Sequence, residues 1–164
     1  MKLSSFLPYR PLQVISLALL GQIVFGCTQI DLYEKITAVP GHAWQSSFKP
    51  TFEFDLTDSS KVYEVLLVLR HNEKYHFNNI YVNLYVQGPG QDTAMKIQRE
   101  LPLAANDKWL GDGMDDIYEH RMTIGLLGES RAIRPGRYRL QIEQIMREDP
   151  LQNVLDVGLR VEKK

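Results

Sequence analysis

The chain has one cysteine among its 164 residues, Cys27, and this scarcity excludes an internal disulfide and a cysteine-based zinc finger. It also lacks an excess of either charge, because 19 Lys and Arg stand against 20 Asp and Glu. Proteins that neutralise many phosphates carry a basic surplus, so the composition predicts no nucleic-acid partner. The sequence has no low-complexity tract and no repeat of roughly 20–50 residues. With 44% hydrophobic residues, it predicts one globular domain.

Long apolar runs are lacking except at the N-terminus. Residues 12–25 are mostly apolar and follow Lys2 and Arg10 without any acid. At about 14 residues this run suits a signal peptide, since a membrane-spanning helix needs about 20. The run ends in Val-Phe-Gly before Cys27, which resembles the lipobox of bacterial lipoproteins. We therefore predict that residues 1–26 are a lipoprotein signal peptide.

The predicted role of Cys27 is to carry the acyl chains that anchor the protein. Two or more chains hold a protein stably on a membrane, at about 0.8 kcal/mol per buried CH₂. Thr28, rather than an acid, follows the cysteine, which in common Gram-negative sorting favours the outer membrane. The expected location is therefore the cell envelope, with the domain in the periplasm. Residues 27–48, which hold no sustained period, are predicted to be a lipid-anchored tether leading into the domain.

Most of the remaining sequence predicts β-strands. Apolar and polar residues alternate in short stretches that turn residues separate, and no long amphipathic helix is present. The seven candidate strands are residues 51–56, 62–69, 80–87, 95–101, 117–127, 138–142 and 154–161. This pattern predicts an all-β fold, a single antiparallel β-sandwich of about seven or eight strands, Ig-like or jelly-roll-like, over residues 49–164.

The sequence shows no recognisable catalytic motif. Ser130 does not lie in a G-x-S-x-G turn, no phosphate-binding glycine loop is present, and Cys27 is assigned to lipid. We therefore predict that the protein is not an enzyme and binds no cofactor.

Metal sites are weakly indicated at two places. His71 and His76 are five residues apart, so in a strand they would face opposite sides, and His42 and His120 have no ligand spacing around them. Residues 111–116 form an acidic, glycine-rich loop that lacks the register of an EF-hand. A solvated turn is the simpler interpretation, and no metal is predicted.

Four aromatic residues are candidates for partner binding. Trp44 and Trp109 lie beside turns, and Tyr81 and Tyr85 share one face of a predicted strand. Rigid aromatic side chains on an outer sheet face are typical interface anchors. The alternative is that they cover the second sheet or a loop.

Four stretches of the chain resemble one known family. They are residues 70–79, residues 109–113, residues 143–151 and residues 156–162. Together with the lipobox they resemble the GldH family of gliding-motility lipoproteins. The resemblance implies an envelope lipoprotein of the gliding apparatus, which is tied to type IX secretion and works with other gliding lipoproteins. The family has no known catalytic motif, so no active site is carried over.

Charged residues in these stretches allow two interpretations. Arg147 and Asp149 are two residues apart, so in a strand they would point the same way and pair. Alternatively, Arg70, Arg147 and Asp149 form a recognition patch. For the whole protein, the alternatives to a gliding component are a periplasmic carbohydrate- or calcium-binding sandwich and a lipid-anchored hydrolase.

Overall fold

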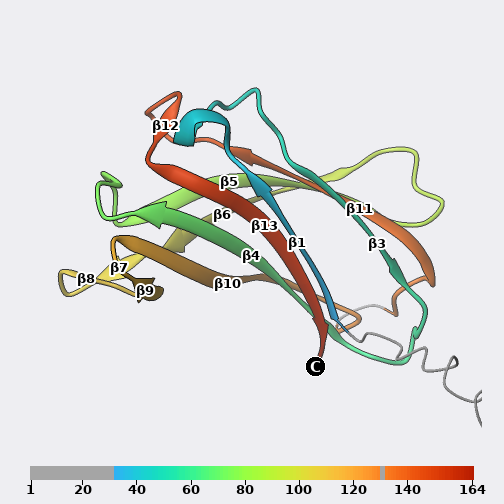
Figure 1. The fold of residues 1–164 in the computed structure, drawn as a ribbon. Helices are drawn as coiled ribbons and strands as arrows, with labels where there is room; N and C mark the ends of the chain where they lie inside the picture. The colour runs from blue at the N-terminus through green and yellow to red at the C-terminus, as the bar shows by residue number, and fades with distance from the viewer. Residues whose placement is uncertain (1–31, 130–131) are drawn as a thin grey trace, which may run out of the picture. The chain divides into compact units, whose positions relative to one another are not determined.

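The computed structural model describes residues 32–129 and 132–164 (Figure 1). The predicted signal peptide and Cys27 lie outside the described residues. One short 3-10 helix, η2 (Pro40–His42), interrupts a chain that is otherwise strands and turns over these ranges. No helix among the described residues is long and apolar enough to span a membrane.

Two antiparallel sheets form the domain, which confirms the predicted β-sandwich (Figure 1). The first has five strands in the order β1 (Leu32–Ala38), β13 (Val154–Lys163), β4 (Tyr63–Asn72), β10 (Ile117–Leu127) and β9 (Asp112–Met114). The second has four strands in the order β3 (Thr51–Leu56), β11 (Gly136–Gln144), β5 (Asn79–Gln87) and β6 (Met95–Pro102). Two short pairs join β12 (Leu151–Gln152) to β2 (Ala43–Trp44) and β7 (Ala104–Ala105) to β8 (Lys108–Trp109).

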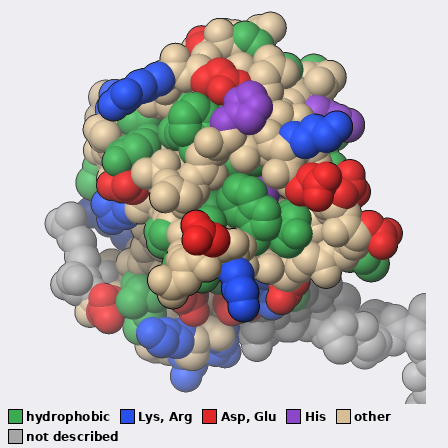
Figure 2. Space-filling view, turned by 90° about the vertical axis from the view of Figure 1, so that its left-hand side faces the viewer, with side chains coloured by type: hydrophobic (Ala, Val, Ile, Leu, Met, Phe, Trp, Pro, Cys, Tyr) green, Lys and Arg blue, Asp and Glu red, His purple; other side chains and the backbone are tan. Residues whose placement is uncertain are grey.

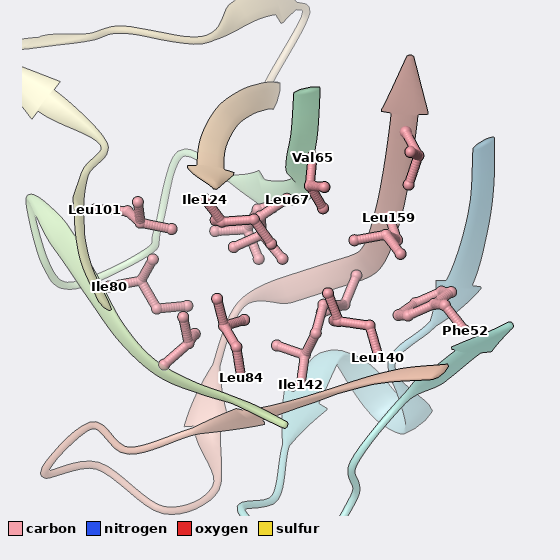
Figure 3. Close-up of a cluster of buried hydrophobic side chains, with 14 of the residues drawn as sticks. Phe52, Val65, Leu67, Ile80, Leu84, Leu101, Ile124, Leu140, Ile142 and Leu159 are labelled. Carbon is pink, nitrogen blue, oxygen red and sulfur yellow. The ribbon is translucent and has the colours of Figure 1, made fainter. Parts of the chain in front are cut away.

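Alternating side chains build the core, and all seven predicted stretches are strands. In β3, Phe52 and Phe54 are buried while Glu53 is exposed. Figure 3 shows such inward side chains meeting between the sheets: Leu67 and Leu159 come from the first sheet, and Leu84, Leu140 and Phe52 from the second. β4 lies in the middle of its sheet, with one face in the core and the other largely half-buried.

The predicted tether over residues 27–48 is wrong for its described part, which is folded into the sandwich. β1 pairs with β13 along its whole length, from Leu32 opposite Glu162 to Ala38 opposite Asp156. β1 is an edge strand whose residues are mostly exposed or half-buried, so its sequence carries little of the alternation that a strand with one fully buried face shows.

The sheet register defines two ends of the domain. At the end where β1 begins, which we call the anchor end, Leu32, Glu162, Glu64 and Leu126 lie at one level across four strands. At the other, which we call the tip end, the level is formed by Ala38, Asp156, Arg70, Glu119 and Asp112. On β10 the two levels lie roughly 20 Å apart, at about 3.3 Å per residue.

Gly158 lies where β1 and β13 approach closely. A Cβ atom at this position would be 2.9 Å from Lys35 O, 2.9 Å from Ile36 Cγ1 and 3.2 Å from Val68 Cβ. Because one neighbour is backbone and the strands are paired on both sides, we expect Gly158→Ala to lower the free energy of unfolding by about 1–3 kcal/mol. Urea unfolding of the purified domain measures this.

Gly125 provides the matched control, because a Cβ atom there would meet nothing within 4 Å. Gly125→Ala is expected to change the free energy of unfolding by no more than about 0.5 kcal/mol. Equal effects of the two substitutions would contradict the close approach.

Candidate functional site

The two tryptophans do not form an open binding surface. Trp44 is 0% exposed and belongs to the core, where its Nε1 donates a hydrogen bond to Phe48 O at 2.8 Å. Trp109 is half-buried and packs edge-on against His71, with ring centroids 4.4 Å apart. The prediction that Trp44 binds a partner is therefore wrong, because its ring is fully buried in the core cluster. Trp109 keeps part of its surface exposed, so its role as a partner contact stays a prediction.

Tyr81 and Tyr85 lie on the outer face of the four-stranded sheet, as the alternation predicts, and both are half-buried. Glu143 organises this face: it accepts hydrogen bonds from Tyr85 Oη at 2.6 Å and Asn83 Nδ2 at 2.9 Å, and it pairs with Lys49 Nζ at 2.6 Å. Burial raises the pKa of Glu143, but these three donors outweigh burial and bring it to about 2.

The ring of Tyr85 is also flanked by cations. Lys49 Nζ lies 5.6 Å and Lys96 Nζ 5.8 Å from its centroid. Tyr85 is thus tied into a polar network, and the exposed part of this face is mainly polar.

The predicted polar cluster is separated in the structure. Asp149 accepts hydrogen bonds from Ser46 N at 2.9 Å and Ser46 Oγ at 2.5 Å, and it makes no ion pair with Arg147 among the described residues. Arg147 is exposed. The predicted Arg147–Asp149 pair is wrong because β11 ends at Gln144, so the two residues do not lie on a strand.

Arg70 instead joins a chain of ion pairs across the outer face of the five-stranded sheet. The chain runs Asp156–Arg70–Glu119–Arg121–Glu34–Arg160–Glu162, with contacts between 2.5 and 3.7 Å. Exposed pairs of this kind contribute roughly 0–1 kcal/mol each. The pairs matter more for recognition than for stability. Because the arginines on this face are already neutralised by acids, they offer little free positive charge to an acidic partner.

A buried histidine pair lies at the tip end. His71 Nε2 and His120 Nε2 are 2.9 Å apart, and His71 Nδ1 is 2.7 Å from Asn72 O. A carbonyl oxygen only accepts, so His71 Nδ1 donates, and His71 Nε2 accepts the proton of His120 Nε2. His71 is therefore neutral in this arrangement, because one of its ring nitrogens donates and the other accepts.

Burial sets the pKa of both histidines. It lowers the pKa of His71. Burial, helped by the repulsion that a protonated His71 would exert and opposed by Asp112, lowers the pKa of His120 to about 4, so His120 is neutral at pH 7. Two histidines alone do not hold a metal ion, and no group of three or more metal-binding side chains occurs in residues 32–129 and 132–164. Sequence reasoning missed this pair because its members are 49 residues apart and meet only through the register of β4 with β10.

Residues 110–117, which we call the tip loop, lie against this pair. A Cβ atom on Gly111 would be 2.5 Å from Glu119 O and 2.9 Å from His120 Cδ2, and one on Gly113 would be 2.9 Å from Tyr118 Cε1. The loop backbone is therefore pressed onto β10. Its side chains face solvent: Leu110 is 57% and Met114 78% exposed.

Figure 2 shows the side of the molecule on which β7, β8 and β9 lie. Hydrophobic side chains are visible there among acidic, basic and histidine side chains. The acidic, glycine-rich stretch singled out in the sequence combines exposed aspartates with the exposed apolar side chains of Leu110 and Met114.

Comparison with known proteins identifies the family. The profile of the GldH lipoprotein family matches residues 31–161. This chain belongs to the GldH lipoprotein family. The GldH resemblance inferred from the sequence is therefore confirmed.

Two relatives cover most of the chain. A gliding motility lipoprotein GldH from Flavobacterium johnsoniae is 27% identical over 155 residues, covering 90% of this chain and 94% of that protein. A GldH homolog from Christiangramia forsetii is 26% identical over 145 residues, covering 84% and 86%.

Among solved structures, a carbohydrate-binding module specific for non-crystalline cellulose is similar, with a TM-score of 0.47 and 10% identity. The match covers 80% of this chain and 73% of that one. A likeness at this level says nothing about a ligand of this chain.

Proposed function

We propose that this protein is a non-enzymatic lipoprotein of the gliding-motility machinery linked to type IX secretion, anchored through acylated Cys27 and acting by contact with other envelope proteins. Its family and the names of its relatives support the role in gliding. The apolar run that ends just before Cys27 supports the anchor. Thr28 supports sorting to the outer membrane, with the domain in the periplasm.

The observation that carries this proposal is the position of Leu32. The first residue of β1 lies at the anchor end and follows Cys27 by five residues. Five residues span at most roughly 17 Å when fully extended. An acylated Cys27 would hold the anchor end close to the membrane and leave the tip end directed toward the periplasm.

The site geometry supports contact rather than catalysis. Both ring nitrogens of His71 are engaged, one with Asn72 O and one with His120 Nε2, and the two buried imidazoles bond to each other rather than to an open site. Tyr81 and Tyr85 keep their proposed role as partner contacts, because their side chains lie partly exposed on the outer face of the second sheet.

The test compares the wild type with Cys27→Ala in cells that glide. We expect the variant to leave the membrane fraction, because the thiol that accepts the diacylglycerol is gone, and spreading motility to fall to the level of a deletion strain. Fractionation followed by immunoblotting gives the first readout, and colony spreading the second.

Two controls make the result specific. Purified wild-type and Cys27→Ala domains should melt at the same temperature, since Cys27 precedes the sandwich. Thr28→Asp should keep the chain on membranes but move it to the inner membrane. Full motility in a Cys27→Ala strain that still makes the protein would refute the anchoring role.

A further inference from the structure

The tip loop exposes an apolar pair beside a hollow. Met114 of β9 and Ile117 of β10 are register partners, so their side chains lie next to each other on the outer face of the sheet. They are 78% and 37% exposed. Together with Leu155 they line a hollow of about 360 Å³. Exposed apolar side chains at a hollow in a charged face are typical of a protein contact site.

The rim of this hollow is acidic. Asp112, Asp115 and Asp116 line it, and within the described part of the chain their carboxylates make no ion pair and no side-chain hydrogen bond. The cation in the lining is Arg70, which already forms ion pairs with Glu119 at 2.5 Å and with Asp156 at 3.7 Å. The three aspartates therefore leave negative charge available to a partner.

We propose that the tip loop binds a protein segment that places an apolar side chain in the hollow and Lys or Arg side chains against Asp112, Asp115 and Asp116. This inference deepens the proposed function and rests on it for the envelope location. Charge complementarity selects the partner: an anionic lipid surface is repelled by the same carboxylates. A second copy would bring an identical acidic tip to a two-fold contact, which is also unfavourable.

The loop is built to present these groups without rearrangement. Gly111 and Gly113 hold its backbone against β10, and the packed rings of His71 and Trp109 lie beneath it. A surface that is already ordered loses little conformational entropy on binding. β9 is also the outermost strand of its sheet, so one edge of its backbone is available to an extended segment.

A photo-crosslinking amino acid at position 114 of the full-length lipoprotein tests the proposal in gliding cells. Position 95 is the matched control, because Met95 is also exposed, at 59%, but lies on β6 beside Leu126 at the anchor end. We expect a protein adduct at position 114 with a yield at least about tenfold that at position 95. Mass spectrometry of the adduct should find Lys or Arg within a few residues of the cross-linked position.

Neutralising the aspartates is the second part of the cross-linking experiment. Asp115→Asn with Asp116→Asn should lower the adduct yield about fivefold, since each carboxylate contributes a modest exposed ion pair. Asparagine tolerates the positive φ of Asp115, which is 56°, so the loop backbone is kept. Asp92→Asn with Glu129→Gln removes two exposed acids elsewhere and should leave the yield unchanged.

The inference is overturned if position 114 cross-links to lipid, to a second copy, or no more than position 95 does. It is also overturned if neutralising the aspartates has no effect. Fractionation of every variant separates this failure from failure of the proposed function, because loss of the tip contact leaves Cys27-dependent membrane attachment intact.

Discussion

Replacing Trp44 by alanine is expected to lower the free energy of unfolding by about 3–5 kcal/mol, the usual cost of removing a fully buried large aromatic side chain. Trp44 is 0% exposed, and its Nε1 donates to Phe48 O. Its carbonyl oxygen also accepts a hydrogen bond from Gln144 Nε2 at 3.1 Å, which joins β2 to the end of β11. Urea unfolding monitored by circular dichroism measures the loss.

Two comparisons show that the effect comes from the core. Trp44→Phe keeps most of the apolar volume and loses the Nε1 hydrogen bond, so a smaller loss of about 1–2 kcal/mol is expected. Tyr81→Ala removes a half-buried ring from the outer face of β5 and should cost no more than about 1 kcal/mol. If Trp44→Ala unfolded like the wild type while partner capture fell, Trp44 would be an interface residue after all.

Acidification is expected to destabilise the domain before its carboxylates are protonated. The folded protein holds His120 at a pKa of about 4, below the value of about 6.5 for an unfolded chain. Between these values the unfolded chain binds a proton that the folded chain does not, so stability rises with pH and falls as pH drops. From pH 7 to pH 4, His120 alone should remove about 3 kcal/mol.

Replacing His120 with glutamine isolates this contribution. Glutamine keeps an amide donor for His71 but does not titrate, so the urea midpoint of His120→Gln should depend much less on pH between 7 and 4.5. Glu143 acts in a lower window, because its pKa of about 2 makes its stabilising contribution fade only below about pH 4.5. An unchanged slope above pH 4.5 in the variant would contradict the neutral histidine pair.

The sequence predicts those strands whose pattern of apolar and polar residues can be read from neighbouring positions alone. β3 and β5 have one buried face each, so alternation of apolar and polar residues identified them and their inward side chains. β1 was not predicted, because an edge strand with little burial has no strong alternation of apolar and polar residues. The sandwich was therefore predicted correctly while its N-terminal boundary was not.

The candidate site depends on contacts that sequence spacing does not encode. His71 and His120 meet because two strands are in register, and Trp44 is buried because β2 pairs with a segment more than 100 residues away. The Arg147–Asp149 prediction assumed a strand that ends three residues earlier. The tip loop carried a local signal, its glycines and aspartates, but only the structure shows that exposed Met114 and Ile117 accompany them.

The pairing of β1 with β13 has a mechanical consequence. β1 starts at the anchor end and runs along β13 through seven register pairs. A pull between Cys27 and a partner held at the tip would act lengthwise on β1, while the hydrogen bonds of an antiparallel pair lie across the strands. Such a load is shared by all the bonds at once instead of peeling them one after another, which is the geometry in which a short strand resists traction best.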